Sequence, residues 1–104
     1  MISKQTILDR IEILRDGTMQ IRFAIQVVED GNVLANDWHR TALPPGTDLT
    51  AQMAAVNDHL VSMGKAAVDP AELTVLTAIL PTVQTDAVVT AYQAKVAASV
   101  AKIG

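Results

Sequence analysis

The chain has no cysteine, which excludes disulfide bonds, thiolate catalysis and cysteine-ligated metals. Aromatic residues are also scarce, since only Phe23, Trp38 and Tyr92 occur among 104 residues. One buried aromatic side chain covers about 150–250 Å², so a core with so few of them gains little from each residue. We therefore predict a marginally stable monomer, or a chain that gains stability from a partner.

A strong excess of one charge and a long apolar run are lacking too. The formal net charge is −3, with both signs spread over both halves. Nucleic-acid binding needs clustered Lys and Arg, and none occurs along the sequence, so we predict no nucleic-acid partner. The longest apolar stretch, 87–101, contains Gln93 and Lys95 and falls short of the about 20 residues of a membrane span. We predict neither a membrane association nor a secretory signal.

Apolar residues alternate with polar ones in the first part of the chain, a period typical of strands with one buried face. The clearest runs are 7–13 and 19–27, and Asp-Gly pairs at 16–17 and 30–31 separate the runs, which indicates hairpins. Pro44-Pro45-Gly46 ends the third strand. We predict an α+β fold in which residues 1–43 form a three-stranded antiparallel β-meander.

The loop of the first hairpin follows from which side chains must share a face. A two-residue Asp16-Gly17 loop would pair Ile13 with Gln20 and set apolar against polar residues. A three-residue loop, Arg15-Asp16-Gly17 with Gly17 in a left-handed conformation, instead pairs Ile13 with Met19 and, further on, Ile11 with Ile21. We predict the three-residue loop.

The second hairpin favours a shorter connection. A two-residue Asp30-Gly31 turn pairs Val27 with Leu34 and Phe23 with Trp38. This pairing predicts that both large aromatic side chains lie on the core face.

Helical periodicity follows the proline-rich turn. We predict helices over 47–64, 70–80 and 85–103, two to three in number, so that 1–104 form a single domain. Thr47 or Asp48 can cap the first helix, and Asp69-Pro70-Ala71-Glu72 is typical of a helix start. Pro81 is predicted to interrupt or restart the second helix.

The last predicted helix carries a stripe in near-heptad spacing that we treat as a candidate interface. Two interpretations are open: the helix packs on its own sheet, or it pairs with copies of itself in a homo-oligomer. The stripe consists of Val89, Tyr92, Val96, Val100 and Ile103.

No catalytic pattern is recognisable. His39 and His59 are the only histidines, and their spacing is not that of a zinc site, so we expect them at the surface or its boundary. We predict no enzyme activity, no cofactor and no metal. The segment Asp37-Trp38-His39-Arg40-Thr41 is the densest polar and aromatic cluster. Trp38 is either a core residue or, with His39 and Arg40, a contact anchor of a second candidate interface.

Residues 7–64 resemble small proteins encoded among the tail and late structural genes of tailed bacteriophages and prophages. The segments that look similar are Leu8-Asp9-Arg10-Ile11-Glu12, Arg15-Asp16-Gly17-Thr18 with Gln20-Ile21-Arg22, Val28-Glu29-Asp30-Gly31, Trp38-His39-Arg40-Thr41 before a Pro-Gly turn, and Asp48 with Ala51-Gln52-Met53-Ala54-Ala55-Val56-Asn57.

The resemblance implies a virion protein of the tail, baseplate or fibre region that is made in the host cytoplasm and binds other phage structural proteins. Three rivals stay open: a tail or fibre assembly chaperone absent from the mature particle, a small-ligand binder or enzyme using the Asp37–Thr41 strand, and a regulator that binds host factors.

Overall fold

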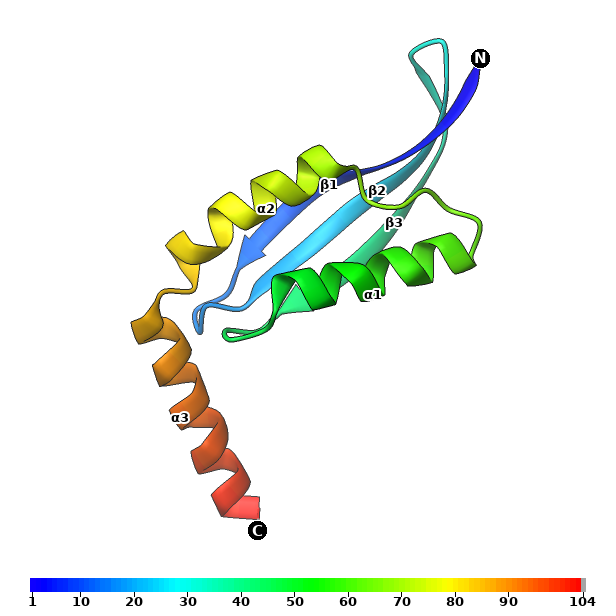
Figure 1. Ribbon diagram of the computed structural model, residues 1–104. Coiled ribbons are helices and arrows are strands. Elements are labelled where there is room, and N and C mark those ends of the chain that lie inside the picture. The colour runs from blue at the N-terminus through cyan, green and yellow to red at the C-terminus, as the bar shows by residue number, and fades with distance from the viewer. Residues whose placement is uncertain (104) are drawn as a thin grey trace.

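The computed structural model describes the backbone of residues 1–103 and the side chains of residues 1–99. It has a three-stranded antiparallel sheet in the order β1-β2-β3, followed by three helices (Figure 1). The predicted α+β class, an N-terminal meander followed by helices, is confirmed. The elements are β1 (Ile2–Ile13), β2 (Met19–Glu29), β3 (Asn32–Leu43), α1 (Leu49–Ser62), α2 (Pro70–Val83) and α3 (Asp86–Ile103).

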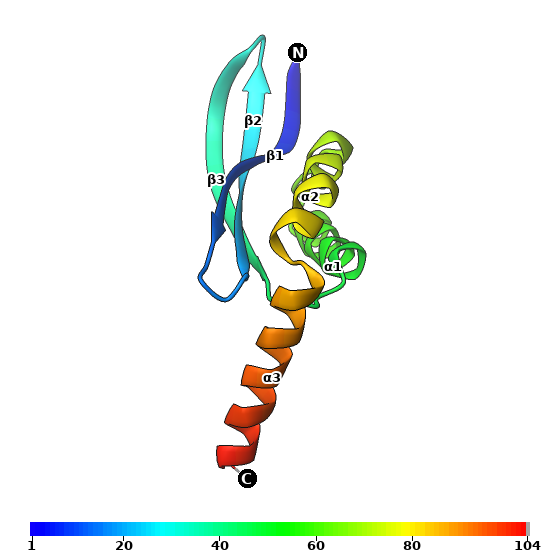
Figure 2. The same ribbon diagram turned by 90° about the vertical axis from the view of Figure 1, so that its left-hand side faces the viewer.

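Helices α1 and α2 lie side by side on one face of the sheet, and the opposite face is uncovered (Figure 2). We call these the covered face and the open face. Alternate side chains of β2 point to opposite faces, so its apolar half enters the core. The buried core consists of Met19, Ile21, Phe23, Ile25, Leu43, Met53, Val56, Leu60, Val68 and Leu76.

The first hairpin has the predicted three-residue loop. The amide of Leu14 donates to the carbonyl of Thr18 at 2.8 Å, and Gly17 has a φ of 92°. The predicted pairs Ile13 with Met19 and Ile11 with Ile21 are confirmed. Positive φ is favourable for glycine because it has no Cβ, which explains why the loop closes at this residue.

Further along β1, a bulge at Asp9 changes the register. Leu8 pairs with Phe23, but Arg10 pairs with Arg22, so Asp9 has no partner across the ladder. Without the bulge, Asp9 would stand opposite Phe23 on the covered face, where burial of its charge would be costly. One extra residue also moves Ile7 to the open face, so it does not share a face with the isoleucines that follow it.

A second bulge, at Leu34 of β3, makes the pairing of the second hairpin differ from the predicted one. The turn itself is as predicted, with φ of 50° at Asp30 and 82° at Gly31. Val27 however pairs with Ala35 rather than Leu34, and Phe23 pairs with His39 rather than Trp38. The prediction that Trp38 lies on the core face beside Phe23 is therefore wrong.

The physical reason for this second bulge lies at the far end of β3. In the predicted register Arg40 would stand opposite Ile21 in the core, and Leu43 would face away from it. The extra residue places Leu43 opposite Met19, and both are buried. Arg40 turns to the open face, which keeps its charge in water.

The helix starts follow their capping residues. Asp48 caps α1, and its carboxylate accepts from the amide of Ala51 at 3.2 Å. Asp69 caps α2 in the same way through the amide of Ala71 at 3.0 Å. These bonds satisfy amides that lack partners in the first turn of a helix.

The helix ends differ in part from the prediction. Helix α1 ends at Ser62, two residues before the predicted end at residue 64, and the residue after it, Met63, is exposed. Helix α2 passes through Pro81 and ends at Val83, beyond the predicted end at Leu80. Pro81 has no amide to donate to the carbonyl of Thr77, and the helix ends two residues after it.

Candidate functional site

Helix α3 leaves the body of the protein instead of lying on the sheet (Figures 1 and 2). It is bent by 76° from α2, and the longest dimension of the molecule is 55 Å. The radius of gyration is 16.3 Å, whereas a compact chain of this length has about 13 Å. Of the two interpretations of this helix, packing on its own sheet is therefore not what the structure shows.

The base of α3 is held against two loops of the body. A Cβ built at Gly17 would collide with Cγ1 of Val88, and one at Gly46 would lie 3.5 Å from Cγ1 of Val89. The side-chain amide of Gln84 donates to the carbonyl of Gly17 at 3.1 Å and to that of Leu43 at 2.7 Å. These contacts fix where α3 starts and how it leaves the body.

The stripe on α3 begins at the body and continues past it. Val89 and Tyr92 are partly buried, and Tyr92 lines a hollow of about 530 Å³ together with the 14–16 loop. Val96, the next position, is exposed. The side chains of Val100 and Ile103, the last two predicted interface residues, lie outside the described part of the structure.

The second candidate cluster, Asp37–Thr41, does not converge on one site. Because β3 is a regular strand there, its side chains alternate between the two faces. His39 and Thr41 are on the covered face, where Thr41 accepts a hydrogen bond from the side chain of Gln52 in α1 at 2.8 Å. Trp38 and Arg40 are on the open face. The structure thus separates His39 from the other two predicted interface residues.

His39 meets the other histidine of the chain. Its ring centroid lies 5.5 Å from that of His59 in α1, between the sheet and the helix. Burial, with a smaller contribution from His59, lowers the pKa of His39. Among the described side chains, those of residues 1–99, no three His, Asp or Glu come close enough to hold a metal ion.

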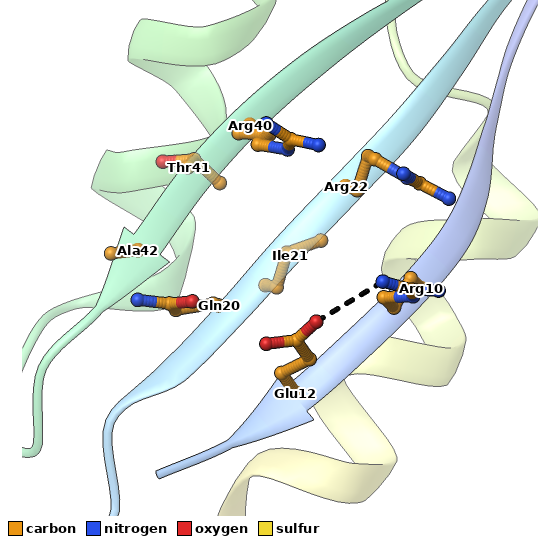
Figure 3. A pocket seen from close by; sticks show the side chains of 8 residues that line it. All are labelled: Arg10, Glu12, Gln20, Ile21, Arg22, Arg40, Thr41 and Ala42. Atoms are coloured by element: carbon orange, nitrogen blue, oxygen red, sulfur yellow. Dashed lines mark hydrogen bonds and ion pairs between the residues drawn. The ribbon is translucent and has the colours of Figure 1, made fainter.

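The open face carries an arginine row that sequence analysis missed. Arg10, Arg22 and Arg40 stand opposite one another on β1, β2 and β3 (Figure 3). Arg10 stands opposite Arg22 through the register of the first hairpin alone, whereas Arg40 reaches Arg22 only because the bulge at Leu34 shifts β3 by one residue relative to β2. The sequence signal was available: carrying the hairpin registers on to Arg40 and Leu43 would have exposed the conflict with the core.

Two carboxylates balance the arginine row in part. Asp9, the bulge residue, accepts from Nη2 of Arg22 at 2.6 Å and from its Nε at 2.8 Å. Glu12 pairs with Arg10 at 3.2 Å in an exposed bridge (Figure 3). Among the side chains of residues 1–99, no carboxylate forms an ion pair with Arg40.

Trp38 lies next to the arginine row on the open face. It is 45% exposed, and Cζ of Arg22 lies 4.2 Å from its ring centroid, which is a cation–π contact. Ala24, the residue that pairs with Trp38, is only 3% exposed. Arg22 is therefore held from two sides, by the carboxylate of Asp9 and by the indole.

The arginine row borders a shallow open hollow of about 490 Å³. Figure 3 shows its polar side chains on three adjacent strands. Beyond Trp38, a ladder of amides crosses the same face, since Gln5 donates to Gln26 at 2.7 Å and Gln26 to Asn36 at 3.1 Å. The open face is thus polar and ordered by its own hydrogen bonds.

Comparisons with protein-family models, with curated proteins and with solved structures find no match to this chain. The resemblance to phage tail proteins therefore stays a prediction. In the described part of the chain, no single helix has the length and apolar composition of a membrane span; α2 and α3 up to Ser99 meet that test only together, across their bend.

Proposed function

We propose that the chain is a non-catalytic structural or interaction protein of a phage particle, in the tail, baseplate or fibre region, and that it docks on a larger assembly through α3. The observation that carries the docking is the departure of α3 from the body (Figure 1). Its stripe is partly covered at Val89 and Tyr92 and is open at Val96. The placement in a phage particle rests on the resemblance of residues 7–64.

Helix energetics support a partner for α3. Residues 94–99 are all exposed, so this part of the helix gains no burial from its own chain. Isolated helices shorter than about 12–15 residues are marginal in water, because most helical stability in proteins comes from packing. A partner that covers Val96 would supply this packing. The edge strands β1 and β3 also offer unpaired backbone groups that suit an assembly.

Particle composition tests this proposal. If the chain is a virion protein, mass spectrometry finds it in particles purified from cells in which the encoding phage or prophage replicates. Val96→Glu should deplete the chain from these particles. Ala94→Glu is the matched control, because it adds the same charge on the same helix outside the stripe, and glutamate is a good helix former. Absence of the unaltered chain from finished particles would favour an assembly chaperone instead.

Self-association needs a separate measurement. Light scattering behind size exclusion, run on the full chain over a concentration series, gives the mass in solution. A stable oligomer that Val96→Glu dissociates would identify a second copy as the first partner of α3. A monomer at all concentrations would leave a different protein as the partner and would exclude the homo-oligomer.

A further inference from the structure

The arginine row has a feature that the core does not explain. The core requires positions 10, 22 and 40 to face outward, but any polar residue would satisfy that requirement. Neighbouring strands lie about 4.8 Å apart, and like charges directly opposite each other in a sheet are destabilising. Three arginines in register therefore cost stability in the free protein, unless a negative group lies across them.

The protein's own carboxylates supply only part of this compensation. The row carries three positive charges, and Asp9 and Glu12 contribute two negative charges. Arg40 has no carboxylate partner among residues 1–99, and it lines the hollow on the open face. The row is thus a local positive site on a chain whose net charge is −3.

We propose that the open face docks an acidic segment of a partner protein, with partner carboxylates on the arginine row and an apolar partner side chain on Trp38. This proposal goes beyond the function proposed above, since it uses neither α3 nor the placement in a phage particle. The planar guanidinium binds carboxylates through two parallel hydrogen bonds, which favours arginine over lysine for this purpose. Tryptophan and arginine are also the residues most enriched among binding hot spots.

Charge distribution favours a protein segment over a nucleic acid. A nucleic acid lays many phosphates along a surface and gains affinity from each counterion released. Here the positive charge is confined to one row, and Asp9 and Glu12 already neutralise two of its three charges, so few cations remain for a long run of phosphates. A short segment with a few carboxylates matches the row without meeting the amide ladder beyond Trp38.

The test uses the full chain and a labelled peptide of alternating Glu and Thr, with the same peptide carrying Gln for Glu as the uncharged control. Trp38 is the only tryptophan, so its emission reports directly on the open face. We expect the acidic peptide to bind and to shift this emission, and the Gln peptide to do neither. Arg40→Gln should weaken binding about tenfold, since it removes one charge-assisted contact.

Matched variants separate recognition from net charge. Arg15→Gln removes the same charge from an exposed loop residue and should change binding by less than about twofold. Arg40→Lys keeps the charge but loses the planar fork, and it should fall between the unaltered chain and Arg40→Gln. Circular dichroism and the melting temperature confirm that each variant is folded.

Several results would overturn the proposal. These are no binding of the acidic peptide, equal binding of the Gln peptide, and an equal loss in Arg15→Gln and Arg40→Gln. Tighter binding of a thymidine oligonucleotide of the same charge would assign the row to a nucleic acid. Displacement of the peptide by inorganic phosphate at equal concentration would assign it to a free anion. Self-association that Arg40→Gln abolishes would assign it to a second copy of the chain.

Discussion

Strand β2 carries two different surfaces on its two sides. On the covered face Met19, Ile21 and Phe23 are buried under α1 and α2, and the hydroxyl of the buried Thr6 donates a hydrogen bond to the carbonyl of Ala66. On the open face of the same strand, Arg22 and Gln26 are held by ion pairs and hydrogen bonds to both neighbouring strands. The covered face is stabilised by burial of apolar area. The side chains of the open face are instead held in place by ion pairs and hydrogen bonds.

The two bulges keep these faces distinct. Each adds one residue to an edge strand, and without it the continued register would turn Asp9 of β1 or Arg40 of β3 into the core. Because the side-chain period is two, a shift of one residue exchanges the faces of every residue beyond it. The shift at Leu34, which keeps Arg40 out of the core, also completes the arginine row, and the shift at Asp9 leaves that carboxylate free to pair with Arg22.

The largest expected effect on stability comes from a comparison of Phe23 with Trp38, which the sequence analysis predicted on the same face. Phe23→Ala should lower the free energy of unfolding by about 3–5 kcal/mol, because Phe23 is fully buried. Trp38→Ala should cost only about 1–2 kcal/mol, because Trp38 is half exposed. Urea unfolding monitored by circular dichroism gives the free energy of unfolding of both variants. Equal losses would contradict the bulge at Leu34.

The next effect concerns the loop between β1 and β2, against which the base of α3 packs. Gly17→Ala should lower the free energy of unfolding by about 2–3 kcal/mol. The change combines the strain of positive φ with a collision against Val88. Gly31→Ala has the same φ strain in open space and should cost about 1 kcal/mol. Thermal unfolding of the pair isolates the contact with α3. If both variants lose the same stability, Val88 does not pack on this loop.

A smaller effect should come from the open face. Asp9→Asn removes the carboxylate that neutralises Arg22 and should cost about 1 kcal/mol at low ionic strength. Asp58→Asn removes the same charge from an exposed position of α1 and serves as the control. Urea unfolding at low and high salt measures both. The loss should shrink at high salt because salt screens the exposed arginines, and a salt-independent loss would argue against this electrostatic account.

The smallest effect is the pH dependence of stability that comes from His39 on the covered face. The folded protein lowers the pKa of His39, chiefly by burial, so the unfolded chain binds a proton more readily. This contribution to stability is therefore complete above the ordinary pKa of 6.5 and is lost as the pH falls below it. Thermal unfolding between neutral and mildly acidic pH measures the slope. His39→Gln should flatten it, and an unchanged slope would assign the dependence to other groups.

Sequence analysis did not predict the arginine row, although most of the local structure was predictable. Local rules were sufficient for the 15–17 loop, the turn at 30–31 and the caps Asp48 and Asp69. They did not reveal the bulges, because a bulge resolves a mismatch between side chains that lie far apart in the sequence but would share the core face. Arg40 would stand opposite Ile21, for example, only if β2 and β3 kept the predicted register, and the two residues are far apart along the chain.

The sequence by itself determined the α+β order of elements, the positions of the turns and the stripe on α3, because each depends on residues adjacent or one helical turn apart. Tertiary structure alone decided the face of Trp38, the alignment of Arg40 with Arg22, and the direction in which α3 leaves the body. Each of these depends on which distant groups compete for the core, and burial of apolar area together with the cost of burying charge settles that competition.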